Sequence, residues 1–446
     1  YLDGAYGWDQ FDENKVSSRV MDYVAGNLSE TGENSVFRTK LCEASLLEYM
    51  FATDNDGTGM LRQASAYMKR HLPEDVAKKM YQQYQDGKKA EADGKTEYSV
   101  EDADQAIINA KKEKEQADQN DKEGAPQEEA GEKNIQDNEN NHAQDAEDGK
   151  KESPIQIVLQ LKQNALLGMT VSDMSSLSAK AVEAKDMVSN RQCETGRYDM
   201  KKAEKMNVSD RVMVLEYIGK HFSDYTEPGK GDLTYEMEYI LCGKDTDKKN
   251  LESSIERLMR MREAANVAHI IADREKLNQT LMIATSLAGF SGNPAVVKIV
   301  QIGVVAAWAY VESILDLRTL LSGGKISLIK SAAEWTTDLK KLGEIVTGEG
   351  KARECKNGLS YQAYIKQLLF AMKQKKMAYR MMDIMELAMQ KEQNGKNARM
   401  DHMIDNMICE LRFEAKPLFA KRSLYGDMEM GGYTFFKRQK LSYINE

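Results

Sequence analysis

Apolar side chains recur every three or four residues along most of this chain, which is the spacing of one face of an α-helix. Only six prolines but twenty-six methionines occur in 446 residues. This favours long helices, because proline breaks a helix whereas methionine forms one well. We therefore expect a mainly α fold. The segments with helical spacing are Phe11–Leu28, Val36–Phe51, Met60–Tyr84, Ser178–Cys193, Ser209–Phe222, Leu251–Leu277, Pro294–Leu321, Tyr361–Gln393 and Ala398–Leu411.

The most apolar segment is Pro294–Leu321, which begins with a proline suited to the first turn of a helix. Its uninterrupted apolar run, Ile302–Val311, is about ten residues long, whereas a membrane span needs roughly twenty. Lys298, Glu312 and Asp316 also fall inside the segment. We therefore expect a buried core helix at residues 294–321, with the rest of the helical body around it.

The end of the chain has a different pattern from the rest. Arg412–Ala420 and Tyr433–Tyr443 carry aromatic and alternating residues on either side of the glycine-containing segment Gly426–Gly432. Alternating runs flanking a glycine-rich turn are typical of a β-hairpin. The expected fold is accordingly α+β, with a small hairpin on the side of a helical body.

An acidic segment, residues 86–153, interrupts the apolar periodicity. It has twenty-one acidic residues and ten lysines, and it contains no Leu, Met, Phe or Trp. Such a composition buries too little apolar surface to offset the entropy of ordering. We expect a disordered insertion, with at most a transient helix around Glu101–Ala117, in one domain made of residues 1–85 and 154–446. The segment contributes −11 to the net charge of −9, so the remainder is close to neutral and lacks the basic footprint of a nucleic-acid binder.

Motifs of common enzyme classes are missing from the sequence. There is no HExxH, no GxSxG, no phosphate-binding glycine loop and no CxxC pair, and the five cysteines are far apart. We therefore expect no catalytic residues, no cofactor and no metal site, and we interpret the cysteines as small buried side chains.

One polar loop, Thr53–Gly59, has the alternating acids of a calcium site. Calcium loops place acids at alternate positions and close with a bidentate acid at the twelfth position. Neither register that uses Asp54 supplies this last carboxylate. A polar turn leading into a helix from Met60 is the favoured interpretation, because Asp, Asn and Gly favour turns by themselves.

Two groups of carboxylates could form an acid–base site. Tyr235–Tyr239 contains two glutamates two residues apart, and Trp308, Glu312 and Asp316 share one face of the apolar helix. Carboxylates in an apolar setting can act as general acid and base. A structural ion network is the commoner arrangement and is the favoured interpretation. The candidate partners are Arg257, Arg260, Arg262 and Arg318.

Methionines recur every four residues at Met377, Met381, Met385 and Met389, with others nearby. A methionine stripe can form an adaptable groove for a partner. At helical spacing it is more often part of the core, which is the interpretation we favour. The nearby methionines are Met382, Met400, Met403 and Met407.

Several sequence blocks together resemble one family. They are Gly4–Trp8, YEMEYILCGK at residues 235–244, AWAYVES at residues 307–313 and GGK at residues 323–325. They resemble a clostridial family of unknown function whose members are commonly encoded beside tight-adherence (Tad) pilus genes. The resemblance spans nearly the whole chain except residues 86–153. It implies an extracytoplasmic body and one membrane helix upstream of Tyr1, as in pilin-like and TadE-like proteins, and it supplies no catalytic or binding residues.

These observations favour a non-catalytic, membrane-anchored structural or assembly component of a Tad-type surface pilus. Such a protein would contact pilus subunits or assembly proteins, and an open edge of the terminal hairpin could accept a partner's strand. One alternative is a cell-envelope enzyme that uses the carboxylates of Tyr235–Tyr239 with Glu312 and Asp316. The other is a calcium-stabilised surface-binding protein built around Asp54 and Asp56.

Overall fold

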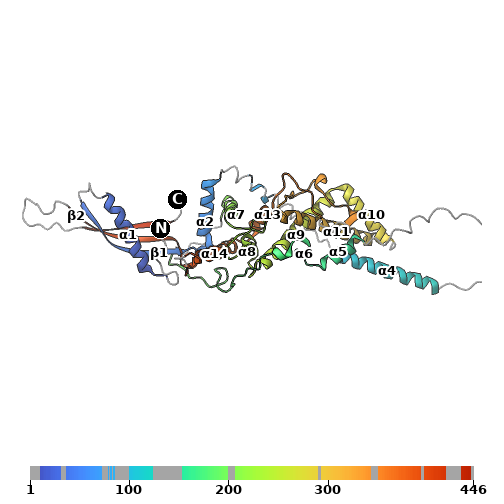
Figure 1. Cartoon of the computed structure of the whole chain (residues 1–446), viewed down its shortest axis with the longest axis horizontal. Coiled ribbons are helices and arrows are strands. Elements are labelled where there is room, and N and C mark those ends of the chain that lie inside the picture. Colours follow the sequence, from blue (N-terminus) through green and yellow to red (C-terminus); the bar gives the residue numbers. More distant parts are fainter. Residues whose placement is uncertain are drawn as a thin grey trace, which may run out of the picture. The chain divides into compact units, whose positions relative to one another are not determined.

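The chain forms two compact units, each assembled from segments that are distant in sequence (Figure 1). Unit 1 comprises Tyr1–Gln82, Ser178–Leu251 and Lys366–Glu446, and unit 2 comprises Gln83–Leu177 and Glu252–Ile365. This division differs from the single domain expected from the sequence. The computed structural model describes residues 11–31, 37–72, 79, 81–82, 84–85, 100–123, 153–198, 206–289, 293–342, 350–392, 396–417 and 433–442.

Helices dominate both units, which confirms the predicted mainly α fold. Within unit 1 they are α1 (Glu13–Thr31), α2 (Asp54–His71), α7 (Val208–His221), α8 (Glu236–Cys242), α14 (Gln374–Gln390) and η6 (Met400–His402). Within unit 2 they are α4 (Val100–Glu123), α5 (Pro154–Lys162), α6 (Leu166–Thr170), η2 (Met174–Ser176), α10 (Arg274–Ala288), α11 (Pro294–Leu321), η4 (Ala332–Glu334) and η5 (Leu339–Lys341). The unit boundaries fall within α9 (Asp247–Ala272) and α13 (Tyr361–Ala371).

A small antiparallel sheet belongs to unit 1. Its strands lie in the order β1 (Phe37–Phe51), β2 (Ile404–Pro417), β3 (Tyr433–Ser442). β2 and β3 form the hairpin predicted near the C-terminus, which is confirmed. The helix predicted over Ala398–Leu411 is wrong, because the chain enters β2 at Ile404. Pairing with a strand on each side satisfies the backbone of β2 and outweighs its local helical preference.

The helix predicted over Val36–Phe51 is also wrong, and the reason is a set of β-bulges. Shifts in the register of β1 on β2 fall between Leu41 and Glu43 and between Leu46 and Glu48. A bulge adds one residue to a strand and so changes the alternation of its side chains. The buried positions of β1 consequently follow spacings of three and two residues, which imitate the spacing of a helix. They are Leu41, Ala44, Leu46, Tyr49 and Phe51.

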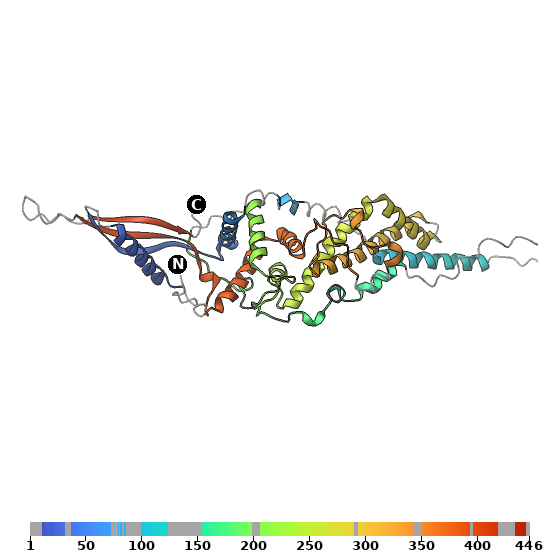
Figure 2. The same cartoon turned by 45° about the horizontal axis from the view of Figure 1, so that its top comes forward.

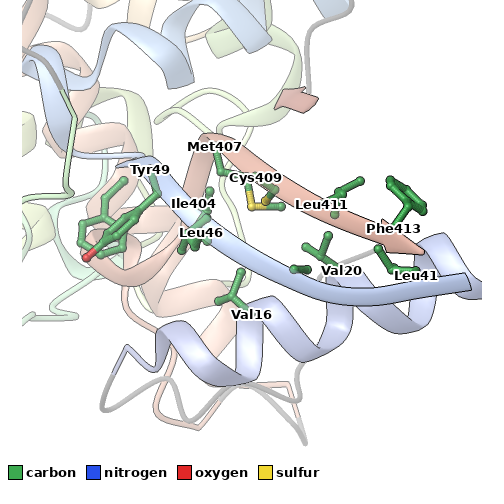
Figure 3. Packing of buried hydrophobic residues seen from close by; sticks show 12 residues of the cluster. Val16, Val20, Leu41, Leu46, Tyr49, Ile404, Met407, Cys409, Leu411 and Phe413 are labelled. Atoms are coloured by element: carbon green, nitrogen blue, oxygen red, sulfur yellow. The ribbon is translucent and has the colours of Figure 1, made fainter. Parts of the chain in front are cut away.

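Helix α1 covers one face of this sheet, and a hydrophobic core lies between the helix and the sheet (Figure 2). Val16 and Val20 point from α1 towards Leu41 and Leu46 of β1 (Figure 3). The buried residues of β2 join the same cluster. They are Ile404, Met407, Cys409, Leu411 and Phe413.

A third predicted helix, Ser178–Cys193, is absent, and the chain there is irregular. Side chains of unit 1 hold this segment in place of helical hydrogen bonds. Asp383 accepts from the backbone N–H of Ser189 at 3.0 Å, and the guanidinium of Arg191 donates to both Glu386 and Asp401. The segment therefore takes its conformation from tertiary contacts that its own sequence does not reveal.

The centre of unit 2 is helix α11, whose bounds match the predicted core helix. Asn293 caps it by accepting from the N–H of Ala295, and nearly every residue from Val300 to Leu321 is buried. Among the described residues it is the one helix long and apolar enough to cross a membrane, and 61 % of its most apolar window is buried. The predicted core helix is therefore confirmed. Figure 1 shows α4, α5 and α10 beside it.

Helix α4 lies inside the segment expected to be a disordered insertion. Val100, Ala103, Ile107 and Ala110 are buried along one face of α4, which packs on α11. Small residues make this contact close, because a Cβ atom added at Gly303 would lie 2.1 Å from the Cβ atom of Ala103. The described part of residues 86–153 thus includes a docked helix, and residues 86–99 and 124–152 lie outside the described residues.

The close packing of α4 on α11 predicts that Gly303→Ala detaches α4. Overpacking of this kind costs about 1–3 kcal/mol, so amide exchange in residues 100–113 should become about tenfold to a hundredfold faster. Mass-spectrometric hydrogen exchange measures this change. Gly168→Ala is the control, because no atom lies within 4 Å of its added Cβ. Unchanged exchange in α4 of Gly303→Ala would contradict the packing.

The Arg191 contacts predict a pH dependence. Burial opposes the charge of Asp401, but hydrogen bonds from Arg399 and Arg191 prevail and lower its pKa well below the ordinary value. Because the folded pKa is depressed, the stabilisation is complete above about pH 5 and is lost as pH falls below about 4. The difference in unfolding free energy between wild type and Asp401→Asn, measured in urea, should therefore shrink from pH 6 to pH 3. A control without a titrating group, Met282→Ala at a position that is 73 % exposed, should give a difference that does not change with pH.

Candidate functional site

The carboxylates that the sequence grouped as a possible acid–base site belong to different units. Glu236 and Glu238 lie in α8 of unit 1, whereas Glu312 and Asp316 lie in α11 of unit 2. Glu236 accepts from the N–H and hydroxyl of Ser223 at 2.9 and 3.0 Å. Glu238 accepts from the N–H of Tyr225 at 2.9 Å. These two carboxylates therefore fix the loop that precedes α8.

Asp316 and Glu312 form a fully buried ion network inside unit 2. The Nε atom of Arg262 and the Nδ2 atom of Asn266 each donate to Asp316 at 3.0 Å. Lys330 forms ion pairs with both Glu312 and Asp316. The side chains of these four charged residues are all 0 % exposed. The structural interpretation of this group is therefore supported by its geometry.

The four arginines proposed as partners do not all behave alike. Arg262 takes part in this network, whereas Arg318 donates to the backbone oxygen of Met169 at 2.7 Å. Sequence reasoning missed Lys330, because it lies in an irregular segment whose spacing from α11 carries no signal.

Glu312 also organises the segment that follows α11. Its carboxylate accepts from the N–H groups of Thr336 and Thr337 at 3.1 and 2.9 Å. The indole N–H of Trp308 donates to the hydroxyl of Thr337 at 2.8 Å, and the rings of Trp308 and Trp335 meet edge to face. A carboxylate surrounded by donors in this way holds backbone in place and has no surface open to a substrate.

The loop Thr53–Gly59 is a left-handed turn at the start of α2. Asn55, Asp56 and Gly57 all have positive φ angles, of 53°, 58° and 70°. Asp54 accepts from the N–H groups of Phe51 and Gly196 at 2.8 and 3.0 Å. No cluster of three or more acidic, histidine or cysteine side chains suited to a metal occurs among the described residues. Asp54 is therefore used internally, to close the turn, and Asp56 forms an ion pair with Lys375 at 3.1 Å.

The methionine stripe divides between core and groove. Met377, Met381 and Met382 are 0 % exposed and belong to the core of unit 1. Met385 and Met389 instead line a groove of about 670 Å³, together with methionines of other elements. The core interpretation therefore applies to the first half of the stripe, whereas the second half lines a groove. The other methionines are Met60, Met400 and Met403.

Strand β3 is exposed at nine of its ten residues, and we call it the β3 edge. It pairs with β2 in an unbroken register of ten residue pairs, and its other side has no strand partner in the described sheet. Tyr433, Phe435 and Phe436 are 56 %, 42 % and 62 % exposed. A long, regular edge with exposed aromatic residues is a template for pairing with another chain.

Basic residues follow the aromatic ones along the β3 edge. Lys437, Arg438 and Lys440 are all exposed, and Arg438 pairs with Glu410 of β2 at 2.9 Å. A groove lined by α1, by the start of β2 and by Leu441 and Ser442 lies at the end of this strand. The β3 edge therefore combines a side without a strand partner in the described sheet, apolar area and positive charge, and it is the candidate interaction surface.

The chain is thus a mainly α protein with a buried ion network and an exposed sheet edge. Residues 144–415 match the model of a family of unknown function, DUF5702, and the chain belongs to this family. No curated protein and no solved structure matches the chain. The ion network lies within the matched range, whereas β3 lies beyond it.

The ion network predicts a large effect of Lys330→Met. The substitution leaves two buried carboxylates short of a positive charge, which should cost about 3–5 kcal/mol of unfolding free energy. Urea unfolding followed by tryptophan fluorescence reports this loss, because Trp308 and Trp335 are next to the network.

Two further variants test the cause of that loss. Adding Glu312→Gln to Lys330→Met should recover part of the stability, since one uncompensated charge is removed. Lys340→Met, at an exposed position in unit 2, should change it by less than about 1 kcal/mol. A loss in Lys330→Met no larger than in Lys340→Met would show that the network does not stabilise unit 2.

Proposed function

We propose that the protein is a non-catalytic, membrane-anchored extracytoplasmic component of a Tad-type surface pilus, with a structural or assembly role. It acts through protein–protein contacts. The resemblance of its sequence blocks to proteins encoded beside Tad pilus genes supports the process and the location. The observation that carries the mode of action is the β3 edge, an unbroken ten-residue strand with exposed aromatic side chains.

The burial of the carboxylates favours this proposal over the enzyme alternative. Glu312 and Asp316 are 0 % exposed and are held by cations and backbone donors, so they offer no surface to a substrate. The alternative of a calcium site is weakened in the same way. The Oδ2 atom of Asp54, one of its proposed ligands, already accepts from the N–H groups of Phe51 and Gly196. An interaction role needs an exposed surface instead, and the β3 edge supplies one.

Affinity capture of the full-length protein from its native cell envelope tests the proposal. We expect mass spectrometry to identify pilus subunits or pilus-assembly proteins among the captured proteins. Cells that lack the gene should carry fewer surface pili by electron microscopy, and the protein should need detergent for release from membranes. Normal piliation without the gene, together with capture of no pilus protein, would refute the proposed process.

A substitution on the β3 edge tests the surface within the same experiment. Phe436→Asp should reduce recovery of captured partners by about tenfold or more, because exposed aromatic residues often dominate an interface. Met282→Asp is the matched control, since Met282 is 73 % exposed but lies in α10 of unit 2. Equal recovery with both variants would place the contact away from β3.

A further inference from the structure

We infer that the β3 edge binds an extended strand of a partner protein that is apolar in one half and acidic in the other. This inference rests on the proposed function, in which the protein acts through protein–protein contacts. It adds the chemistry of the partner and its backbone conformation.

The backbone of β3 is suited to strand addition. Its register with β2 continues without a bulge from Tyr433 to Ser442, so its outer N–H and C=O groups form a regular row. The other edge strand, β1, has three register shifts and half-buried side chains. Bulges protect the edge of a sheet from pairing with another chain. The edge at β1 is therefore protected and the edge at β3 is not, which is expected if only β3 binds a strand.

The side chains of β3 divide the strand into two halves. Tyr433, Phe435 and Phe436 make the first half apolar. The ring of Phe435 stacks on the ring of Phe413 in β2, with 5.1 Å between the ring centroids. The second half carries Lys437, Arg438 and Lys440. Side chains opposite each other across two strands interact directly, so the complementary strand places apolar residues beside the first half and acids beside the second.

The positive charges are present on both faces of the sheet. Lys437 is opposite Leu411, which faces α1, whereas Lys440 is opposite Ile408 on the other face. An incoming strand therefore needs two acids three positions apart, one on each face, to meet both lysines. Lysines on an edge strand can protect it from pairing with other chains. The β3 edge also exposes three aromatic side chains, which do not serve such protection and favour a contact instead.

Neither a second copy nor the chain's own acidic segment fits this edge well. Antiparallel pairing of two β3 strands about their centre would place Lys437 of each copy opposite Arg438 of the other, and opposed like charges are destabilising. It would also place Lys440 opposite Phe435, so neither half of the strand would meet its complement. Outside α4, the acidic residues 86–99 and 124–152 have only Tyr98 and Ile135 as large apolar residues, so they cannot supply the apolar half. A separate protein is the occupant that satisfies both halves.

Fluorescence anisotropy with the full chain and three labelled ten-residue peptides tests the inference. The first peptide alternates Val and Thr in one half and has consecutive Glu residues in the other, so that acids lie on both faces of the added strand. The second has Lys in place of Glu. We expect the acidic peptide to bind at least tenfold more tightly, with an affinity that falls as salt is raised. A third peptide, acidic but with three prolines, should bind at least tenfold more weakly, since proline cannot donate a backbone hydrogen bond.

Charge reversal at the edge supplies the specificity test. The variant Lys437→Glu/Lys440→Glu should prefer the basic peptide, while the control Lys230→Glu/Lys248→Glu, at exposed positions elsewhere in unit 1, should keep the wild-type preference. Equal binding of acidic and basic peptides, undiminished binding of the proline peptide, absence of binding, or dimerisation of the wild type through β3 would each overturn the inference. None of these outcomes alters the envelope capture, which decides the pilus role separately.

Discussion

Antiparallel pairing between β1 and β2 is the interaction on which the candidate surface depends. It joins residues 37–51 to residues 404–417, segments near opposite ends of the sequence. The hairpin of β2 and β3 alone would be marginally stable, because two strands bury too little apolar surface. β1 adds a third strand and α1 adds a covering helix, with Val16 and Val20 in the shared core. Pairing at such separation requires the closure of a long loop, so we expect it to form slowly.

Unit 2 relies on a different device, an ion network placed in an otherwise apolar core. The residues around Glu312 and Asp316 in α11 are apolar, so these charges would be costly without Arg262 and Lys330. The carboxylates also hold the irregular residues after α11 against the helix. For instance, Glu312 accepts from the backbone N–H of Thr337. A wholly apolar helix would have no groups to hold irregular backbone, whose N–H groups need acceptors.

The sequence predicted those helices whose start, end and apolar face are marked by nearby residues. It failed where contacts with residues far along the chain determine the secondary structure. α11 was predicted with its bounds because Pro294 and an unbroken apolar stripe define it. β1 was mistaken for a helix because its bulges give Leu41, Ala44 and Leu46 the spacing of a helix. Of the candidate surface, the hairpin and its aromatic residues were predictable from alternation. Lys330 in the ion network was not, since no local pattern relates it to Glu312.

The matched family range separates the framework from the candidate surface. The match ends at residue 415, within β2, so it includes the ion network and the central strand but not β1 or β3. Family membership therefore follows from the helical framework, whereas the β3 edge is supported by its exposure, regular register and charge alone. Because an edge strand can change its side chains without disturbing a core, it is a suitable place for partner specificity to vary. A relative that matches over the same range would share the framework without having to share the partner.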